Sequence, residues 1–164
     1  MIRPILAHPD PRLRMVSRPV EHFDDKLRAL VDDMFETMYD AQGIGLAAVQ
    51  IGVHLRLAVM HVEDNPKRVL VNPEYEALGE PMPLDEGCLS VPGMRDRTKT
   101  RGDWVRVRAQ DVDGTPYEFE ARGLEAACVQ HECDHIDGKL YIDHLTPVRR
   151  SRLLKRYQKE RERG

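Results

Sequence analysis

Hydrophobic residues recur at helical spacing between residues 24 and 40, and polar residues fill the positions between them. The apolar positions are Leu27, Leu30, Val31, Met34 and Met38. This spacing predicts a helix over 24–40, with Asp24 or Asp25 as its N-cap. Gly43 and Gly45 then break the helical pattern, and we expect them to form a turn that leads into a buried strand.

The middle of the chain carries the patterns of β-strands. Two short apolar runs, 55–62 and 68–72, predict strands, and Pro73 is expected to end the second one. Residues 104–112 alternate between apolar and polar, which is typical of a strand with one buried face. An Asp-Gly pair follows and favours a hairpin turn, so a return strand is expected at 116–121.

Two further helices are predicted toward the C-terminus. The segment 124–136 is largely apolar and is stopped by Asp137-Gly138. The last helix is expected from about Val148 to the C-terminus, with only a thin apolar stripe. Because strands do not alternate regularly with helices, the pattern favours an α+β fold with mainly antiparallel sheets over a doubly wound parallel sheet.

Composition narrows the class of protein. The chain has 164 residues, a length that suits one domain. Its composition, with 41% hydrophobic and 32% charged residues, argues against disorder. No apolar run approaches the roughly 18 residues that a membrane span needs. The N-terminal residues reach Pro4 and His8 too soon for a signal peptide, so we interpret the chain as cytoplasmic.

Charge is distributed unevenly along the chain. Residues 148–164 contain eight basic and two acidic side chains, whereas the whole chain has a net charge of −3. We therefore divide the chain into a catalytic domain, 1–147, and a basic helical tail, 148–164. Such a tail is either a solvated helix end or a surface for a negatively charged partner.

The segment His131-Glu132-Cys133-Asp134-His135 is an H-E-x-x-H sequence within the predicted helix 124–136. Residues four apart lie on one helix face, so His131 and His135 can converge on one metal ion. Glu132 lies beside that face and can reach a water molecule without being a ligand. The apolar helix is expected to be buried, and buried imidazoles need a partner such as a metal. A solvated helix with two histidines is the alternative.

A catalytic metal usually has three protein ligands, and the cysteines are candidates for the third. Cys128 and His135 are about 10 Å apart along the helix axis, too far to share one ion easily. Cys133 points away from His131. Cys88 lies in the turn-rich stretch 85–92, and without the histidine helix it would be interpreted as a small buried side chain in a loop.

Three motifs follow one another along the chain: G-x-G-x-A-A-x-Q at 43–50, E-G-C-x-S at 86–90 and H-E-x-x-H at 131–135. Together they resemble the peptide deformylase family, and the likeness extends to 8–13 and 137–140. The resemblance implies an α+β fold with a central helix that carries H-E-x-x-H, plus N-terminal and C-terminal helices. It implies a metal-dependent hydrolase that removes the formyl group from the N-terminal formylmethionine of newly synthesised polypeptides and releases formate.

The same resemblance implies the roles of the site residues. Cys88, His131 and His135 would be the ligands of one divalent metal ion, natively Fe²⁺, which Zn²⁺, Ni²⁺ or Co²⁺ can replace. Glu132 would move the proton, while the Gln50 amide and the backbone N–H of Leu89 would donate to the formyl oxygen.

The resemblance also suggests how a substrate and other partners would bind. Arg101 is expected to pair with Glu86 and brace the Cys88 segment. The substrate-binding residues are expected to be Gly43, Ile44, Gly45, Gly87, Arg95, Leu124, Ala127 and Cys128. The partners would be N-formylmethionyl nascent peptides, and the ribosome through the basic tail, with no membrane and no DNA.

Three other classes of protein are alternatives to this interpretation. A general H-E-x-x-H endopeptidase would cleave unformylated peptides. A structural metal module would show a fourth ligand and a closed site. A redox thiol protein is the least favoured, because the chain has no C-x-x-C pair.

Overall fold

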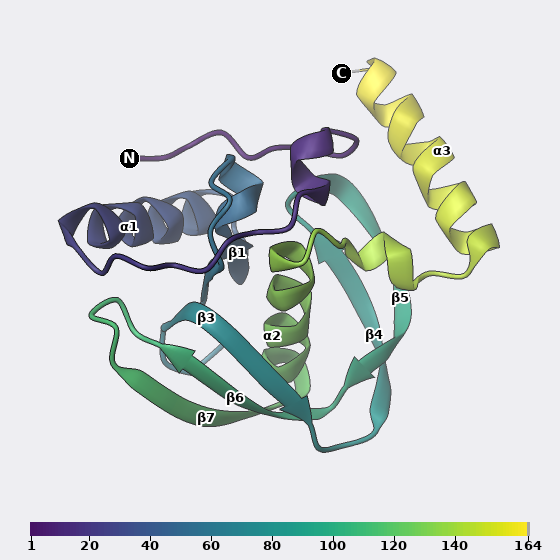
Figure 1. Ribbon diagram of the computed structural model, residues 1–164. Helices are drawn as coiled ribbons and strands as arrows, with labels where there is room; N and C mark the ends of the chain where they lie inside the picture. Colours follow the sequence, from purple (N-terminus) through teal and green to yellow (C-terminus); the bar gives the residue numbers. More distant parts are fainter. Residues whose placement is uncertain (164) are drawn as a thin grey trace.

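Three α-helices and two antiparallel sheets make up residues 1–163, the part of the chain that this computed structural model describes (Figure 1). The predicted α+β class with antiparallel sheets is therefore confirmed. The helices are α1 (Asp25–Asp40), α2 (Gly123–Ile136) and α3 (Pro147–Arg163). The strands are β1 (Gly45–Ala47), β2 (Leu57–Met60), β3 (Arg68–Ala77), β4 (Pro81–Cys88), β5 (Val91–Gly102), β6 (Trp104–Gln110) and β7 (Pro116–Arg122). Short 3-10 turns are η1 (Pro11–Arg14), η2 (Ala48–Ile51) and η3 (Tyr141–His144).

Helix α2 lies in the middle of the molecule. The larger sheet has the strand order β1-β2-β3-β6-β7, and β4 and β5 form a separate hairpin. Figure 1 shows α2 between these two sheets, and it contacts β1, β2 and β7 on one side and β5 on the other. Its buried residues, among them Ala126, Val129 and Ile136, join the core formed by the larger sheet. The central helix is thereby held from both sides.

Helix α1 agrees closely with its prediction. It begins one residue after Asp24, whose carboxylate accepts a hydrogen bond of 3.1 Å from the backbone N–H of Leu27. The side chain of this N-cap satisfies a donor that the first helical turn leaves unpaired. The apolar face of α1 packs against β1 and β2, so the helix covers the start of the segment 43–50.

The prediction that Pro73 ends a strand is wrong. Strand β3 runs on to Ala77, and the pairing with β6 shifts register between Val71 and Glu74. Asn72 has a φ of 50° at this irregularity, and its side-chain amide bonds to the backbone of Val20. A proline, which has no N–H to donate, is tolerated at a bulge of this kind.

The expectation of a turn-rich loop at 85–92 is also wrong. Strand β4 includes Glu86 and Cys88, and β5 begins at Val91, so only two residues form the turn between them. Cys88 therefore lies at a strand end, where the hairpin holds its backbone. The other predicted strands differ from the observed ones only at their ends.

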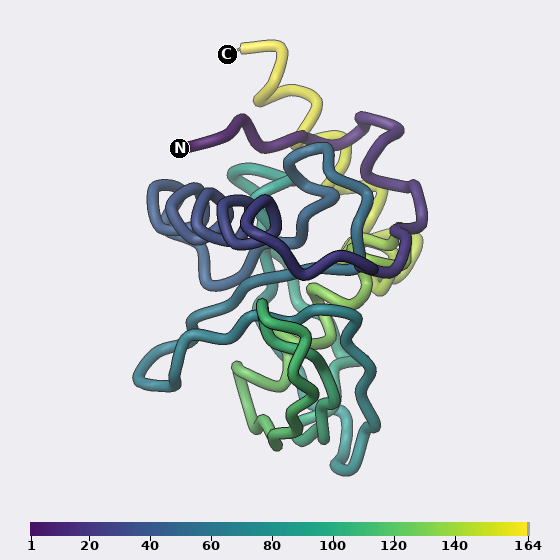
Figure 2. Tube along the Cα trace, turned by 60° about the vertical axis from the view of Figure 1, so that its left-hand side comes forward, coloured from purple at the N-terminus to yellow at the C-terminus, as the bar shows by residue number. Residues whose placement is uncertain are grey.

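Helix α3 lies at the edge of the molecule, packs against β5, and passes close to the N-terminal segment in both views (Figure 2). It begins at Pro147, one residue earlier than predicted, and the predicted last residue, 164, lies outside the described part. Leu153 and Tyr157 are its buried side chains, and the Tyr157 hydroxyl donates to the carbonyl of His8 at 2.6 Å. Within residues 1–163 there is no helix long and apolar enough to cross a membrane.

Candidate metal centre

His131 and His135 face each other from successive turns of α2. The helix predicted over 124–136 is observed at Gly123–Ile136. The two rings are 4.9 Å apart between centroids, and their Nε2 atoms are 3.2 Å apart. The four-residue spacing thus brings both imidazoles to one point, as the helix geometry requires.

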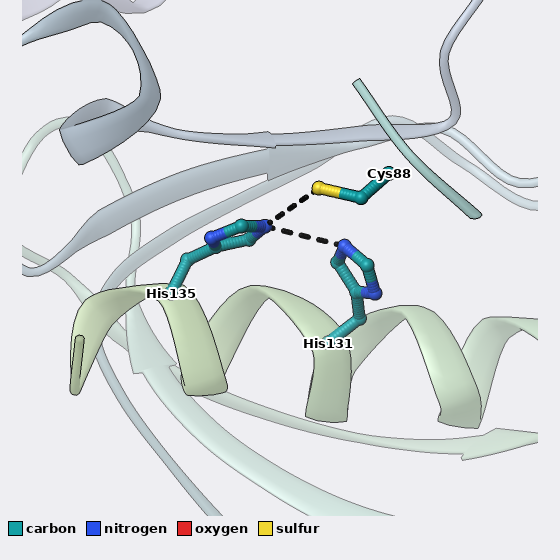
Figure 3. A group of neighbouring side chains, drawn as sticks. All are labelled: Cys88, His131 and His135. Carbon is teal, nitrogen blue, oxygen red and sulfur yellow. Dashed lines mark hydrogen bonds between the residues drawn. The ribbon is translucent and has the colours of Figure 1, made fainter. Parts of the chain in front are cut away.

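Cys88 reaches the same point from the end of β4. Its Sγ lies 3.2 Å from the Nε2 of His135, and the three side chains each offer an atom within 4.8 Å of the others (Figure 3). The backbone N–H of Ser90 also points to Sγ, at 3.4 Å. The three residues expected to hold a metal are therefore together, and such a group can bind one ion.

A buried carboxylate sets the orientation of His131. Glu86 Oε2 lies 2.6 Å from His131 Nδ1, and because a carboxylate accepts, the Nδ1–H donates. Nε2 is then the ring nitrogen that faces Cys88 and His135, as in other histidine sites held by a carboxylate. Glu86 is itself held by Arg101, at 2.7 Å and 3.1 Å, and by Thr98, at 2.7 Å. The expected pair between Arg101 and Glu86 is present.

The neighbouring imidazoles favour the thiolate form of Cys88. Burial alone would raise the pKa of this thiol, but the charges and hydrogen bonds of His135 and His131 outweigh it and place the pKa well below its ordinary value. The thiolate is the form in which cysteine binds metals. The electrostatics of the group therefore suit a cation.

Glu132 is buried beside the group. Its Oε1 has no hydrogen-bond partner within residues 1–163, and burial raises the pKa of this carboxyl despite the two nearby histidines. A methyl group on Gly45 would lie 2.5 Å from Glu132 Oε2, so only glycine allows β1 to come this close. A buried carboxylate oxygen without a partner is costly in a purely structural role.

A cleft of about 790 Å³ opens over this group. All the residues predicted for the site except His135 line it, including the eight expected to bind the substrate. The Gln50 amide Nε2 donates to Ser90 Oγ at 3.0 Å and lies 3.7 Å from Cys88 Sγ. Leu89 is half-buried, and its side chain lies against Gly43.

The other two cysteines are outside the group. Cys128 lines the cleft, but its Sγ is paired with the carbonyl of Ile44, at 3.8 Å, and with Glu132 Oε2, at 4.0 Å. Cys133 is buried in the main core, and burial raises its pKa to about 12.

Sequence reasoning missed two contributors to the site. The first is Ser90, which contacts both Gln50 and Cys88. Its place in E-G-C-x-S was a signal, since it closes the motif two residues after the cysteine. The second is Asp134, which pairs with Arg101 at 2.6 Å. Asp134 lies inside H-E-x-x-H at a position that the motif leaves open, so its partner could not be assigned.

The fold and the site define a class of protein: an α+β protein in which an H-E-x-x-H helix meets a cysteine from a β-hairpin beneath an open cleft. Comparison with known proteins makes the assignment specific. The family model for polypeptide deformylase matches residues 2–151, and the chain belongs to that family. The prediction of an enzyme of this class is thereby confirmed.

Relatives and solved structures agree over almost the whole chain. The peptide deformylases of Azotobacter vinelandii and Pseudomonas aeruginosa are 54% and 52% identical over 159 residues, which is 95% of this chain and 94% of theirs. A crystal structure of the Legionella pneumophila enzyme matches with a TM-score of 0.91 at 46% identity, covering 100% of this chain and 99% of that one. The Ehrlichia chaffeensis enzyme in complex with actinonin has a TM-score of 0.92 at 38% identity, with 97% of each chain covered.

Proposed function

We propose that this protein hydrolyses the formyl amide at the N-terminus of formylmethionyl polypeptides in the cytoplasm. One observation carries the proposal. Cys88 Sγ and the Nε2 atoms of His131 and His135 lie within 4.8 Å of one another. Next to them is Glu132, whose buried Oε1 has no hydrogen-bond partner in residues 1–163. Hydrolysis of an amide requires both an electrophile for the carbonyl oxygen and a group that transfers a proton.

The group fits a divalent metal ion, which Cys88, His131 and His135 would hold. One thiolate and two neutral imidazoles suit several divalent ions, so we propose Fe²⁺ as the native metal, with Zn²⁺, Ni²⁺ or Co²⁺ as replacements. When bound, such an ion supplies a Lewis acid that polarises the formyl carbonyl and lowers the pKa of water.

Glu132 is proposed to carry the proton. It takes a proton from the water that attacks the formyl carbon, holds it on its buried carboxylate, and delivers it to the amine nitrogen as the C–N bond breaks. The products are formate and a free N-terminal amine. The raised pKa of the Glu132 carboxyl supports this role, because it favours holding the proton between the two steps.

Hydrogen-bond donors at the base of the cleft are proposed to stabilise the charge on the formyl oxygen. These are the Gln50 amide and the backbone N–H of Leu89. Removing one such donor from an enzyme costs about 10²- to 10³-fold in rate. A formyl carbon carries only hydrogen beside its oxygen and nitrogen, so a narrow site around it would admit formyl and exclude acetyl.

The walls of the cleft are proposed to bind the peptide. Ile44, Leu124, Ala127 and Cys128 would surround the methionine side chain. Gly43, Gly45 and Gly87 would expose backbone to an extended chain, as strands do in other peptide sites. Arg95, which pairs with Asp85 at 2.9 Å, lies in the same cleft and would meet the substrate further along.

The test is a chelator-controlled assay. Metal-free protein reloaded with Fe²⁺ under exclusion of oxygen should hydrolyse formyl-Met-Ala and leave acetyl-Met-Ala intact. Actinonin, which is bound by the Ehrlichia chaffeensis relative, should inhibit the reaction. Cleavage of casein with no activity on formyl-Met-Ala would contradict the proposal and favour the endopeptidase.

The variant Glu132→Ala tests whether Glu132 transfers the proton, in the same assay. The variant should keep its metal and lose at least about 10²-fold in turnover, because a positioned acid-base group contributes about 10²- to 10⁴-fold. Cys133→Ala, next to it on the buried side of α2, is the matched control and should retain most activity. Turnover by Glu132→Ala above a few per cent of the wild-type rate would remove Glu132 from the mechanism.

The basic tail is proposed to bring the enzyme to ribosomes. Arg152, Lys155, Arg156 and Lys159 are exposed on α3, whereas Leu153 and Tyr157 are buried beneath them. Changing the four exposed residues to glutamate should abolish pelleting with ribosomes at low salt and leave hydrolysis of formyl-Met-Ala unchanged. Equal pelleting at low salt would indicate an ordinary solvated helix.

A further inference from the structure

A chain of polar side chains leads from His131 to a partly exposed histidine, His144, at the end of η3 (residues 141–144). Each contact in it is short. Arg101 donates to Glu86, the partner of His131, at 2.7 Å and to Asp134 at 2.6 Å. His144 Nε2 lies 2.8 Å from the same Asp134 oxygen, Oδ2. The chain therefore connects the candidate metal centre with η3, which the proposed mechanism does not use.

The ring of His144 is held on two sides. Because Asp134 is a carboxylate and accepts, His144 Nε2–H is the donor in their contact. Nδ1 on the other side lies 2.8 Å from the hydroxyl of Thr100, which belongs to β5. His144 is thus a bridge between the last turn of α2 and the hairpin strand that carries Arg101.

Asp134 depends on this bridge. Arg101 is only 2% exposed, and a guanidinium buried to that degree keeps its place only while its carboxylate partners keep theirs. Glu86 is buried and has two partners besides Arg101, namely Thr98 and His131, whereas the Asp134 side chain is 14% exposed and can rotate toward water. Without His144, Asp134 has a competing solvated position, and the guanidinium that orients Glu86 loses one of its two anchors.

We propose that His144 is a positioning residue for the metal centre: through Asp134, Arg101 and Glu86 it fixes the ring of His131 and so sets how tightly the Cys88, His131 and His135 group binds a divalent ion. The inference rests on the proposed function, since it assumes that this group holds a metal. It adds a residue 13 positions beyond His131 that does not line the cleft.

The experiment is a titration of metal-free, full-length protein with Co²⁺, followed by the thiolate-to-cobalt absorption band of Cys88. Loss of a direct partner of a ligand histidine costs about 10- to 100-fold in metal affinity, and His144 lies further out. His144→Ala should therefore raise the dissociation constant about 3- to 10-fold. His144→Gln, whose amide can still donate to Asp134, should stay within about twofold of wild type.

Two further variants separate positioning from general damage. Thr100→Val leaves His144 in place but removes its second contact, and should raise the dissociation constant about twofold to threefold. His22→Ala changes an exposed histidine far along the chain from this network and should have no effect. Thermal unfolding of each metal-free variant checks that the fold is intact.

The outcomes are distinct. Wild-type protein that binds no Co²⁺ through Cys88 overturns the proposed function and this inference with it. Wild-type binding that His144→Ala leaves within twofold overturns the inference alone. So does a failure of His144→Gln to restore affinity, or an equal loss in His22→Ala.

Discussion

At the scale of single residues, the thiol pKa values of two cysteines in the same cleft are shifted in opposite directions. The imidazoles of His131 and His135 lower the pKa of Cys88, whereas burial, followed by the charge of Glu132, raises the pKa of Cys128 well above its ordinary value. A thiolate at Cys88 can therefore bind a cation at neutral pH, and the Cys128 thiol stays neutral and packs as an apolar side chain.

This contrast predicts different effects of two matched substitutions. Cys88→Ala should lose its metal after dialysis, because two histidines alone bind divalent ions weakly. Cys128→Ala should keep one metal ion per chain and lose only about 1 kcal/mol of stability from the small cavity it leaves. Elemental analysis of both dialysed proteins measures the difference. Metal retained by Cys88→Ala and lost by Cys128→Ala would make Cys128, and not Cys88, the third ligand.

The same residues show what could be predicted for the site. The four-residue spacing of His131 and His135 was sufficient to place them together, because helix geometry is local. The contribution of Cys88 depended on the family resemblance, since the sulfur arrives from a hairpin more than 40 residues away. The links from Arg101 to Asp134 and on to His144 depend on the packing of three elements, and no spacing in the sequence encodes them.

At the scale of elements, the helices were predicted well and the hairpin β4–β5 was missed. Helix α1 has a clear apolar period and an Asp24 N-cap, and α2 is a long apolar stretch that ends before Asp137-Gly138. The hairpin contains Pro81, Pro83, Pro92 and several charged residues, which are usually signs of a loop. Its pairing is set by the partner strand and by contacts with α2 and η3, so the sequence pattern alone favours the wrong interpretation.

The turn after α2 offers a test of how that helix is held. Gly138 has a φ of 78°, and a methyl group there would lie 2.5 Å from the carbonyl oxygen of Arg14. Gly138→Ala should therefore lose about 2–4 kcal/mol of unfolding free energy, from backbone strain and the clash together.

Gly93→Ala is the matched control for this turn. Its φ is 81°, but no atom lies within 4 Å of the added methyl group, so it should lose only about 1 kcal/mol. Urea unfolding of both variants measures the difference. Equal losses would mean that the contact with Arg14 does not matter.

At the scale of the whole molecule, an ion pair joins distant parts of the chain. Arg14 in η1 contacts Asp143 in η3 at 2.6 Å and 3.1 Å, and the backbone N–H of Leu140 also donates to Asp143. Burial would raise the pKa of Asp143, but these hydrogen bonds outweigh it and lower the pKa below its ordinary value. The pair fixes η1 against η3, the segment that follows α2.

Because the folded-state pKa of Asp143 is depressed, its contribution is present above the unfolded pKa of about 4 and is lost as the pH falls through the folded value. Asp143→Asn should cost about 1 kcal/mol at pH 7, and this difference from wild type should shrink as the pH falls below about 4. Urea unfolding from pH 7 to pH 3 tests this, with Asp32→Asn on the exposed side of α1 as the control. A difference that stays constant with pH would exclude the ionic contribution.

The division into domain 1–147 and tail 148–164 stays a prediction. The buried Leu153 and Tyr157 connect α3 with β5, η3 and the N-terminal segment. Charge changes on the exposed face of α3 are therefore a cleaner probe of the tail than its removal, which would uncover part of the core.

Strand β1 is the edge strand of the larger sheet, and it borders the cleft with Gly45, which has no side chain. A peptide that pairs with such an edge strand is recognised through its backbone N–H and C=O groups, which every polypeptide has in common. In the proposed binding mode, selectivity would come from the N-terminal end of the peptide that reaches the Cys88, His131 and His135 group, and the residues after it would contribute little. An enzyme built in this way would be a generalist, able to serve a whole proteome with one small cleft.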